Sequence, residues 1–295
     1  MISENRIRAL LQPLLSHLSF YLPASHGDQK VSIPVLRGTG LGVYKQFRSG
    51  EELWKLGLYK RLLGLTDGLF VDVGVNLGQT LIQLRQIDRE RPYLGFEPNP
   101  DCLHYVDTLI RRNSYAHVEL LAVGIGENTG VLSLYLPPGR STDSTATLIK
   151  DLRPDRDYDA RQVPIFSEDH LVGLIGDRKL GVVKVDVEGA EPEVFKGLRN
   201  SIDKDRPAVL CEVLFTDHRG DLDASATRNA ELMSILGGIG YRVFQIRKSD
   251  DRQRIAALTS MDEFPRGYHE GENMALADYL FLPAEHAENW GQSLL

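Results

Sequence analysis

The sequence of 295 residues has little cysteine, tryptophan or methionine, with two, two and four residues of these types. Its two cysteines, Cys102 and Cys211, lie in separate apolar runs, and neither has a cysteine or histidine at zinc-ligand spacing. A disulfide framework and a zinc-finger motif are therefore excluded as the basis of the fold. We expect two buried, reduced thiols in a reducing compartment.

The sequence also has no excess of positive charge and no long hydrophobic run. Lys and Arg number 34 against 41 Asp and Glu, a net charge of −7. Proteins that bind nucleic acid usually carry a basic excess or stripe, so we expect no nucleic-acid partner. The longest uncharged stretch, residues 9–27, holds prolines, histidines and serines and is too polar to span a membrane. It lacks the features of a signal peptide, so the expected location is cytoplasmic.

From residue 67 onward, short apolar runs alternate with amphipathic stretches. Seven runs predict strands, at residues 68–74, 92–98, 117–124, 180–186, 207–213, 241–247 and 277–283. Helical periodicity predicts helices at residues 78–88, 100–113, 191–202 and 224–240. Apolar strands that alternate with helices are typical of a parallel sheet covered on both faces, so the predicted fold class is α/β.

This pattern divides the chain into an N-terminal extension, residues 1–66, and a main domain, residues 67–295. The extension is expected to contain a helix at 3–22, a small β pair at 31–36 and 41–47, and a helix at 51–64. The leucine stripe of the first helix would pack on the main domain or on a second subunit, which makes a homodimer one expectation. A membrane-surface helix is a weaker alternative, because its polar face has few basic residues.

Two insertions interrupt the main domain, at residues 127–166 and 249–276. The first is expected to hold a strand pair around a polar loop. Its hydroxyl-rich run, residues 140–147, either recognises a sugar or is a solvated loop. The second carries Tyr268 and His269 as candidate substrate contacts, although surface histidines are common. Long loops in a compact domain are often functional, so we expect these insertions and the N-terminal region to build the substrate pocket.

The strongest local motif is FVDVGVNLGQT at residues 70–80, where a buried strand leads through a turn into a helix. Asp72 lies in the strand, and Gly74, Asn76 and Gly78 follow. Glycines let the backbone approach a ligand, and the helix start offers free N–H groups and a positive dipole end. Asn76 replaces the second glycine of a dinucleotide-binding turn. This substitution favours the zwitterionic tail of S-adenosylmethionine over a pyrophosphate.

An acidic residue, Glu97, ends the next predicted strand in the run PYLGFEP. A carboxylate at this position is placed to bind both hydroxyls of a ribose. The spacing from Asp72 fits a dinucleotide or S-adenosylmethionine equally well. No basic residue stands beside Glu97, which argues against a ligand with a 2′-phosphate.

The third motif is VVKVDVEGAEPEVFKG at residues 182–197. The run predicts an apolar strand with Lys184, Asp186 and Glu188 at its carboxyl end. This is the edge where open α/β sheets bind ligands. Glu191 is equally well explained as a helix-start residue. Glu212, at the end of the following strand, adds another carboxylate to the same edge.

Together these runs resemble the FkbM-type family of S-adenosylmethionine-dependent methyltransferases. The matching runs cover residues 68–215 in the family's order: FVDVGVNLGQT, GFEPNP, LLAVGIGENTGVLSLYL, VVKVDVEGAEPEVFKG and PAVLCEV. Val75 departs from the alanine usual in the first motif and crowds the tail pocket slightly. The family often has an aspartate before the helix that precedes the fourth strand, and Asp169 is the candidate for it.

The resemblance implies a Rossmann-like, seven-stranded class I methyltransferase sheet, mostly parallel, whose last strand is antiparallel. It implies S-adenosylmethionine as cofactor and transfer of a methyl group to a hydroxyl of a sugar or a natural product. The residues that it implies for the cofactor are Asp72, Gly74, Asn76 and Gly78 at the methionine tail, Glu97 at the ribose, Val123 beside the adenine, and Asp186. It places Asp186 and Glu188 at the methyl-transfer centre.

For the reaction, we expect Asp186 or Glu188 to act as the base, with Lys184 tuning their charge. A Mg²⁺ ion held by Asp186, Glu188 and Glu212 is an alternative, but no compact ligand motif supports it, so no metal is expected. Two other function classes stay open. One is a non-catalytic binding protein on the same sheet, and the other is a nicotinamide-dependent oxidoreductase. The expected partner is a small-molecule or glycan acceptor.

Overall fold

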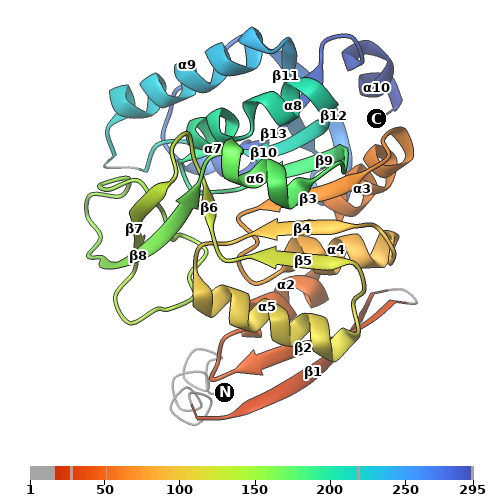
Figure 1. Ribbon diagram of the computed structural model, residues 1–295, viewed down its shortest axis with the longest axis vertical. Coiled ribbons are helices and arrows are strands. Elements are labelled where there is room, and N and C mark those ends of the chain that lie inside the picture. The colour runs from red at the N-terminus through yellow and green to blue at the C-terminus, as the bar shows by residue number, and fades with distance from the viewer. Residues whose placement is uncertain (1–16, 27–28, 51, 218–219, 294–295) are drawn as a thin grey trace.

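The computed structural model describes residues 17–26, 29–50, 52–217 and 220–293 (Figure 1). Its centre is an eight-stranded sheet with the strand order β12-β11-β13-β10-β9-β3-β4-β5. The strands are Leu69–Val73 (β3), Tyr93–Phe96 (β4), Val118–Leu121 (β5), Leu180–Val185 (β9), Ala208–Glu212 (β10), Tyr241–Lys248 (β11), Ile255–Met261 (β12) and Asp278–Pro283 (β13). All seven predicted strands are present.

The direction of the strands also agrees with the prediction. Strands β3, β4, β5, β9 and β10 pair in parallel, and β13 is antiparallel to both β10 and β11. The chain moves outward from β3 to β5, then returns to β9 on the other side of β3. The carboxyl ends of β3 and β9 therefore flank a topological switch point, the usual ligand-binding position of such sheets.

Helices cover the two faces of the sheet. One face carries Leu53–Leu65 (α3), Gln79–Ile87 (α4) and Pro100–Asn113 (α5), and the other carries Glu168–Ile175 (α6), Glu191–Gly197 (α7), Arg199–Asp205 (α8) and Leu222–Gly238 (α9). Residues of β3 alternate between the two cores: Val71 and Val73 pack with the α6–α9 side, whereas Phe70 packs with the α3–α5 side. Burial on both faces explains why these strands are apolar throughout.

The helix predicted at residues 191–202 is two helices, α7 and α8. Leu198 separates them with φ −128° and ψ 13°, and its side chain is fully buried in the core. The apolar periodicity continues through this break because both helices pack on the same core. The prediction of one continuous helix was wrong for that reason.

The N-terminal extension differs most from its prediction. Its elements before α3 are Ser19–His26 (β1), Gln29–Leu36 (β2) and Leu41–Ser49 (α2). Residues 3–16 of the predicted first helix lie outside the described residues, and residues 19–22 belong to β1, so the helix prediction is wrong there. The segment pairs along its whole length with β2, and Pro23, which a helix interior tolerates poorly, is opposite Ser32.

The prediction of a strand at residues 41–47 is also wrong, because this segment is helix α2. Gly40 and Gly50 flank it in the left-handed conformation, with φ 99° and 72°, so these glycines bound a helix. Val43 and Phe47, four residues apart, pack in one cluster with residues of β1, β2, α4 and α5. Residues four apart that pack on the same side are typical of a helix, which explains why the strand prediction fails here.

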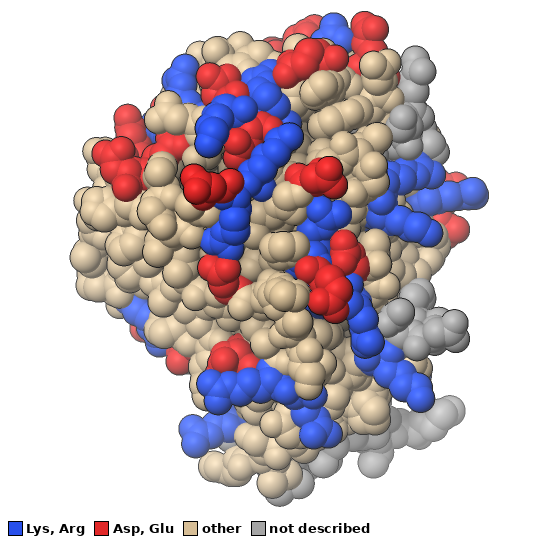
Figure 2. All heavy atoms as spheres, turned by 45° about the vertical axis from the view of Figure 1, so that its right-hand side comes forward, with Lys and Arg blue, Asp and Glu red and all other residues tan. Residues whose placement is uncertain are grey.

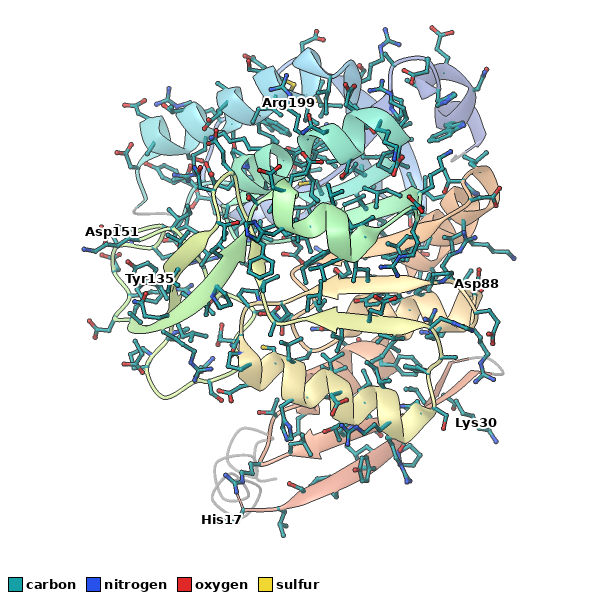
Figure 3. The ribbon with its side chains drawn as sticks, in the orientation of Figure 1. His17, Lys30, Asp88, Tyr135, Asp151 and Arg199 are labelled. Atoms are coloured by element: carbon teal, nitrogen blue, oxygen red, sulfur yellow. The ribbon has the colours of Figure 1, made fainter. Side chains whose placement is uncertain are left out.

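The first insertion forms a separate small layer at the carboxyl end of the sheet. Its predicted strand pair is Gly130–Leu136 (β7) and Asp159–Phe166 (β8), and Gly124–Ile125 (β6) joins β8 to make a three-stranded sheet. Figure 3 shows Tyr135 and Asp151 in this layer, on the side toward which β4 and β5 point, with Asp88 at the opposite end. The insertion is therefore positioned over the ligand-binding edge.

The second insertion is more regular than expected. It contains β12, which extends the sheet beyond the seven predicted strands by pairing antiparallel with β11. A short 3-10 turn, Gly271–Ala275, leads into β13, and helix Ala287–Ser293 (α10) follows β13. The charged residues at both ends of this insertion obscured the strand between them.

Figure 2 shows Lys and Arg side chains next to Asp and Glu side chains over one face of the molecule. Both cysteines of the chain are buried and free of disulfides, as predicted. Among the helices in the described part of the chain, none combines the length and the apolar character required to cross a membrane.

Candidate active site

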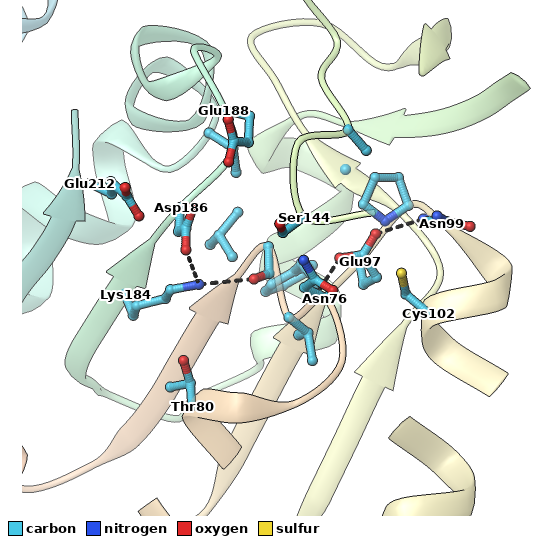
Figure 4. A pocket seen from close by; sticks show the side chains of 18 of the residues that line it. Asn76, Thr80, Glu97, Asn99, Cys102, Ser144, Lys184, Asp186, Glu188 and Glu212 are labelled. Carbon is cyan, nitrogen blue, oxygen red and sulfur yellow. Dashed lines mark hydrogen bonds and ion pairs between the residues drawn. The ribbon is translucent and has the colours of Figure 1, made fainter. Parts of the chain in front are cut away.

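A cavity of about 350 Å³ lies at the carboxyl ends of β3, β4, β9 and β10 (Figure 4). We call it the first cavity. Its lining from these strands and the turns after them includes Gly74, Val75, Asn76, Glu97, Pro98, Asn99, Lys184, Asp186, Val187, Glu188 and Glu212. The volume is within the range usual for small-ligand sites.

The carboxylate of Glu97 is fixed in this cavity by two backbone groups. The N–H of Asn76 donates to Oε2 and the N–H of Asn99 donates to Oε1, each at 2.8 Å. Asn76 reaches this position with a left-handed backbone, φ 50°. Burial raises the pKa of Glu97 to about 7, although the hydrogen bonds from Asn99 and Asn76 oppose the rise. The turn after β3 therefore orients the acidic residue after β4.

A buried lysine connects the ends of β3 and β9. The Nζ atom of Lys184 donates to the carbonyl oxygen of Gly74 at 2.9 Å and lies 3.4 Å from Oδ2 of Asp186. It also lies 3.2 Å from Oδ1 of Asp72, whose other oxygen accepts a 2.6 Å hydrogen bond from Tyr93. Burial alone would lower the pKa of Lys184, but Asp186 and Asp72 raise it, so the lysine stays charged.

Gly74, directly after β3, lies in close contact with Asp186, directly after β9. It has φ 85°, and a Cβ atom there would lie 1.9 Å from the carbonyl oxygen of Asp186. The N–H of Asp186 in turn donates to the carbonyl oxygen of Val73 at 3.0 Å. Only glycine allows this contact, which holds Asp186 beside the turn after β3.

Glu188 is held by the first insertion. Its backbone is left-handed, φ 54°, and its carbonyl oxygen accepts a 2.6 Å hydrogen bond from the hydroxyl of Thr147. Its carboxylate forms an ion pair with Arg153. Burial and the charge of Asp186 raise the pKa of Glu188 to about 7, and Arg153 opposes this rise. Near neutral pH this carboxyl group can therefore both accept and release a proton.

A second cavity, of about 430 Å³, adjoins the first and shares Glu188 and Glu212 with it. Its lining also includes residues of the loop 149–156, the segment after β10, helix α9 and its cap, together with Thr145, Gly189, Glu191 and, from the second insertion, His269. Burial and the nearby charge of Arg153 lower the pKa of His269. The two carboxylates thus stand between two adjoining cavities.

In the described part of the chain, no group of three or more His, Cys, Asp or Glu residues is arranged to hold a metal ion. Of the three carboxylates considered for Mg²⁺, Asp186 lies beside Lys184 and Glu188 pairs with Arg153, while the cation that acts on Glu212 is Lys55. The magnesium alternative therefore gains no support from the geometry.

A family model described as the methyltransferase FkbM domain matches residues 72–243, more than half of the chain. The chain belongs to the FkbM methyltransferase family. The match begins at Asp72 in the first motif and includes Glu97, Asp186, Glu188 and Glu212.

The individual relatives have low sequence identity to this FkbM-family chain. The chain is 24% identical over 146 residues to Methyltransferase 1 of Beauveria bassiana (strain ARSEF 2860), covering 45% of this chain and 59% of that protein. It is similar to a solved FkbM methyltransferase from Methylobacillus flagellatus KT, at 16% identity and a TM-score of 0.42, covering 93% of this chain and 59% of that one. The chain thus spans about three fifths of the length of these two proteins.

Another similar structure is the O-methyltransferase TomG from Streptomyces achromogenes, which is involved in tomaymycin synthesis and was solved in complex with S-adenosylmethionine. Its identity to this FkbM-family chain is 12% and the TM-score is 0.42, with coverage of 78% of this chain and 79% of that one.

Six of the predicted site residues line the first cavity of this FkbM-family chain: Gly74, Asn76, Glu97, Lys184, Asp186 and Glu188. The others lie behind it. The side chain of Asp72 is completely buried under Lys184, and Gly78 caps α4 and packs against Leu109. Val123 is part of the core, and its neighbours Gly124 and Ile125 line the cavity instead.

Sequence reasoning missed several residues that line or support the site. Thr147 and Arg153 come from the first insertion and contact Glu188. Lys55 and Glu52 come from the N-terminal extension, line the first cavity and form a 2.7 Å ion pair. The only signal for Lys55 was a charge on the otherwise apolar face of its helix. Asp169, suggested by the family pattern, is exposed on α6 and lines neither cavity.

Proposed function

We propose that the protein is an S-adenosylmethionine-dependent methyltransferase that methylates a hydroxyl group of a sugar or a natural product. One observation carries this proposal. The same cavity is lined by Glu97, which the turn after β3 orients, and by Asp186 and Glu188 at the end of β9. A carboxylate that can bind a ribose and carboxylates that can accept a proton thus line the same cavity, as methyl transfer from a nucleoside cofactor requires.

The lining fits the cofactor in its chemistry. Glu97 keeps free lone pairs for ribose hydroxyls, since each oxygen accepts one described hydrogen bond. Asn76 and the open N–H groups at the start of α4 suit the polar methionine tail. Pro98, Ile125 and Leu148 offer apolar surface for an adenine. When bound, S-adenosylmethionine supplies an electrophilic methyl group.

The carboxylates at the end of β9 perform the proton chemistry. In such a transfer the acceptor oxygen would bond to the methyl carbon as the methyl–sulfur bond breaks to leave S-adenosylhomocysteine, and Asp186 or Glu188 would take the proton of the hydroxyl. Asp186 is one-third exposed, and Lys184 keeps a positive charge beside it. The adjoining second cavity holds the rest of the acceptor, so the two cavities set donor and acceptor side by side.

Calorimetric titration with S-adenosylmethionine and S-adenosylhomocysteine tests the cofactor, with NAD as the control ligand. We expect a Kd on the order of micromolar for the first two and no binding of NAD. Glu97→Ala should abolish binding, whereas Glu119→Ala should not, because Glu119 is exposed on β5 and pairs with Arg178. Failure to bind S-adenosylhomocysteine would favour a non-catalytic role, and binding of NAD alone would favour an oxidoreductase.

The acceptor atom is tested separately. Incubation with methyl-labelled S-adenosylmethionine and a panel of sugars and polyketides should give a product in which NMR locates the label on an oxygen atom. Label on nitrogen or carbon would refute O-methylation while leaving the cofactor assignment intact.

A further inference from the structure

The second cavity holds cationic side chains that the protein does not neutralise. Within the described residues, the side chains of Arg228 in α9 and Lys150 in the first insertion form no hydrogen bond or ion pair, and the side chain of Arg156 forms one hydrogen bond, to the hydroxyl of Thr145 at 3.4 Å. All three line this cavity. Lys150 and Arg156 are exposed, whereas Arg228 is half-buried, so among these three it is the missing partner of Arg228 that calls for an explanation.

Arg228 is the most informative of these residues. Its guanidinium is partly buried, and burial lowers the pKa of Arg228 although Glu191 and Asp221 raise it from a distance. A desolvated guanidinium without a hydrogen-bond partner is energetically unfavourable, and an anion placed there would remove this penalty.

Four of the six acidic residues that line this cavity have other partners; of the remaining two, Glu212 also lines the first cavity and Asp151 is exposed. Glu191 accepts the N–H of Gly189, Asp221 caps α9 through the N–H groups of Asp223 and Ala224, and Glu188 pairs with Arg153. Asp217 has an interaction of its own, and Asp151 is exposed in the insertion layer. The cavity is therefore lined by Glu188 and Glu212, which it shares with the first cavity, and by Arg228 and Arg156, which line this cavity alone.

We propose that the acceptor carries an acidic group, a carboxylate or a phosphate, which Arg228 binds with support from Arg156. The opposite end of the acceptor then presents its hydroxyl to Asp186 and Glu188, which would repel an anion and so fix the orientation. This inference rests on the proposed function, because it assigns the second cavity to the acceptor.

The test uses the full chain loaded with S-adenosylhomocysteine and three probes measured by calorimetry. These are methyl β-D-glucopyranosiduronic acid, D-glucose 6-phosphate and the neutral methyl β-D-glucopyranoside. We expect at least one acidic probe to bind about tenfold or more tightly than the neutral one. The stronger of the two acidic probes identifies the acidic group as carboxylate or phosphate.

Arg228→Gln and Arg156→Gln should remove the preference for the acidic probe. Arg242→Gln is the matched control, because Arg242 is exposed on β11 and lines neither cavity. Retained binding of S-adenosylhomocysteine shows that each variant is folded. Equal binding of acidic and neutral probes, no binding of either acidic probe, or a preference that survives in Arg228→Gln would overturn the inference. If the unmodified protein does not bind S-adenosylhomocysteine, the proposed function itself is refuted.

Discussion

The Nζ atom of Lys184 lies 3.2 Å from Oδ1 of Asp72, with side chains that are only 8% and 0% exposed. Burial raises the pKa of Asp72, while Lys184 and the hydrogen bond from Tyr93 oppose that rise. Because Lys184 also contacts Asp186 and the backbone of Gly74, it joins a core carboxylate to the cavity. Asp72 therefore acts on the site through Lys184 and makes no contact with the cavity itself.

Lys184→Met is expected to destabilise the protein by about 3–5 kcal/mol, because it leaves Asp72 charged and buried without its cation. Chemical denaturation followed by circular dichroism measures this loss. Lys196→Met is the control: Lys196 has three carboxylate neighbours, Glu127, Glu193 and Glu231, but lies nearer the surface. Its replacement should cost less than about 1 kcal/mol.

A second change separates charge from packing at this pair. Asp72→Asn in the Lys184→Met background removes the stranded charge and should recover part of the stability. If Lys184→Met lowers the free energy of unfolding no more than Lys196→Met does, the buried pair of Lys184 and Asp72 does not stabilise the fold.

Residues at the strand ends could be located from the sequence. Glu97, Asp186 and Glu188 each follow an apolar strand, and parallel strands bring their carboxyl ends to one edge. The side of the sheet on which Asp72 lies could also be predicted from the sequence. It alternates with Val71 and Val73 and so shares the α3–α5 side of the sheet with Phe70.

Long-range contacts could not be predicted in the same way. Arg153 and Thr147 reach Glu188 from a loop of irregular structure, where no periodicity fixes the direction of a side chain. In the extension, the glycines around α2 were compatible with a hairpin or with helix ends, and only the packing on α5 and α4 decides between them.

Gly74→Ala is expected to disrupt the site. The new Cβ would lie 1.9 Å from the carbonyl oxygen of Asp186 at a backbone φ of 85°, so the ends of β3 and β9 must separate. We expect a loss of stability on the order of 3 kcal/mol and loss of S-adenosylhomocysteine binding. Thermal unfolding and calorimetry give the two quantities.

Gly57→Ala is the matched control for Gly74→Ala. Gly57 is exposed within α3, and a Cβ there would meet no atom within 4 Å. Alanine should therefore stabilise the protein by up to about 1 kcal/mol. Normal cofactor binding by Gly74→Ala would contradict the close approach of β3 and β9.

Asp186→Asn should reduce turnover by about 10²-fold or more if Asp186 is the base, because the amide cannot accept the proton. The affinity for S-adenosylhomocysteine should change by less than about tenfold, since the amide oxygen still accepts hydrogen bonds. Labelled methyl transfer and calorimetry measure these effects. Asp203→Asn, on the exposed surface of α8, is the control. Normal turnover by Asp186→Asn would assign the base to Glu188.

The stability of the protein is expected to fall as the pH rises through about 7. Burial raises the pKa of Glu191 from 4.5 to about 7, although the N–H of Gly189 opposes the rise. A carboxyl group with a raised pKa in the folded state stabilises the fold fully below pH 4.5 and loses this contribution as it ionises near pH 7. Denaturation at pH 5 and pH 8 should differ by up to about 3 kcal/mol for this group.

Glu191→Gln tests the assignment, because the amide keeps an acceptor for the N–H of Gly189 and cannot ionise. The variant should be more stable than the wild type at pH 8 and close to it at pH 5. Glu285→Gln should be less stable than the wild type at pH 8, since hydrogen bonds from Arg206 lower the pKa of Glu285 to about 2 and stabilise its charged form. A Glu191→Gln variant less stable than the wild type at pH 8 would mean that the ionised carboxylate is favourable in the fold, contrary to its burial.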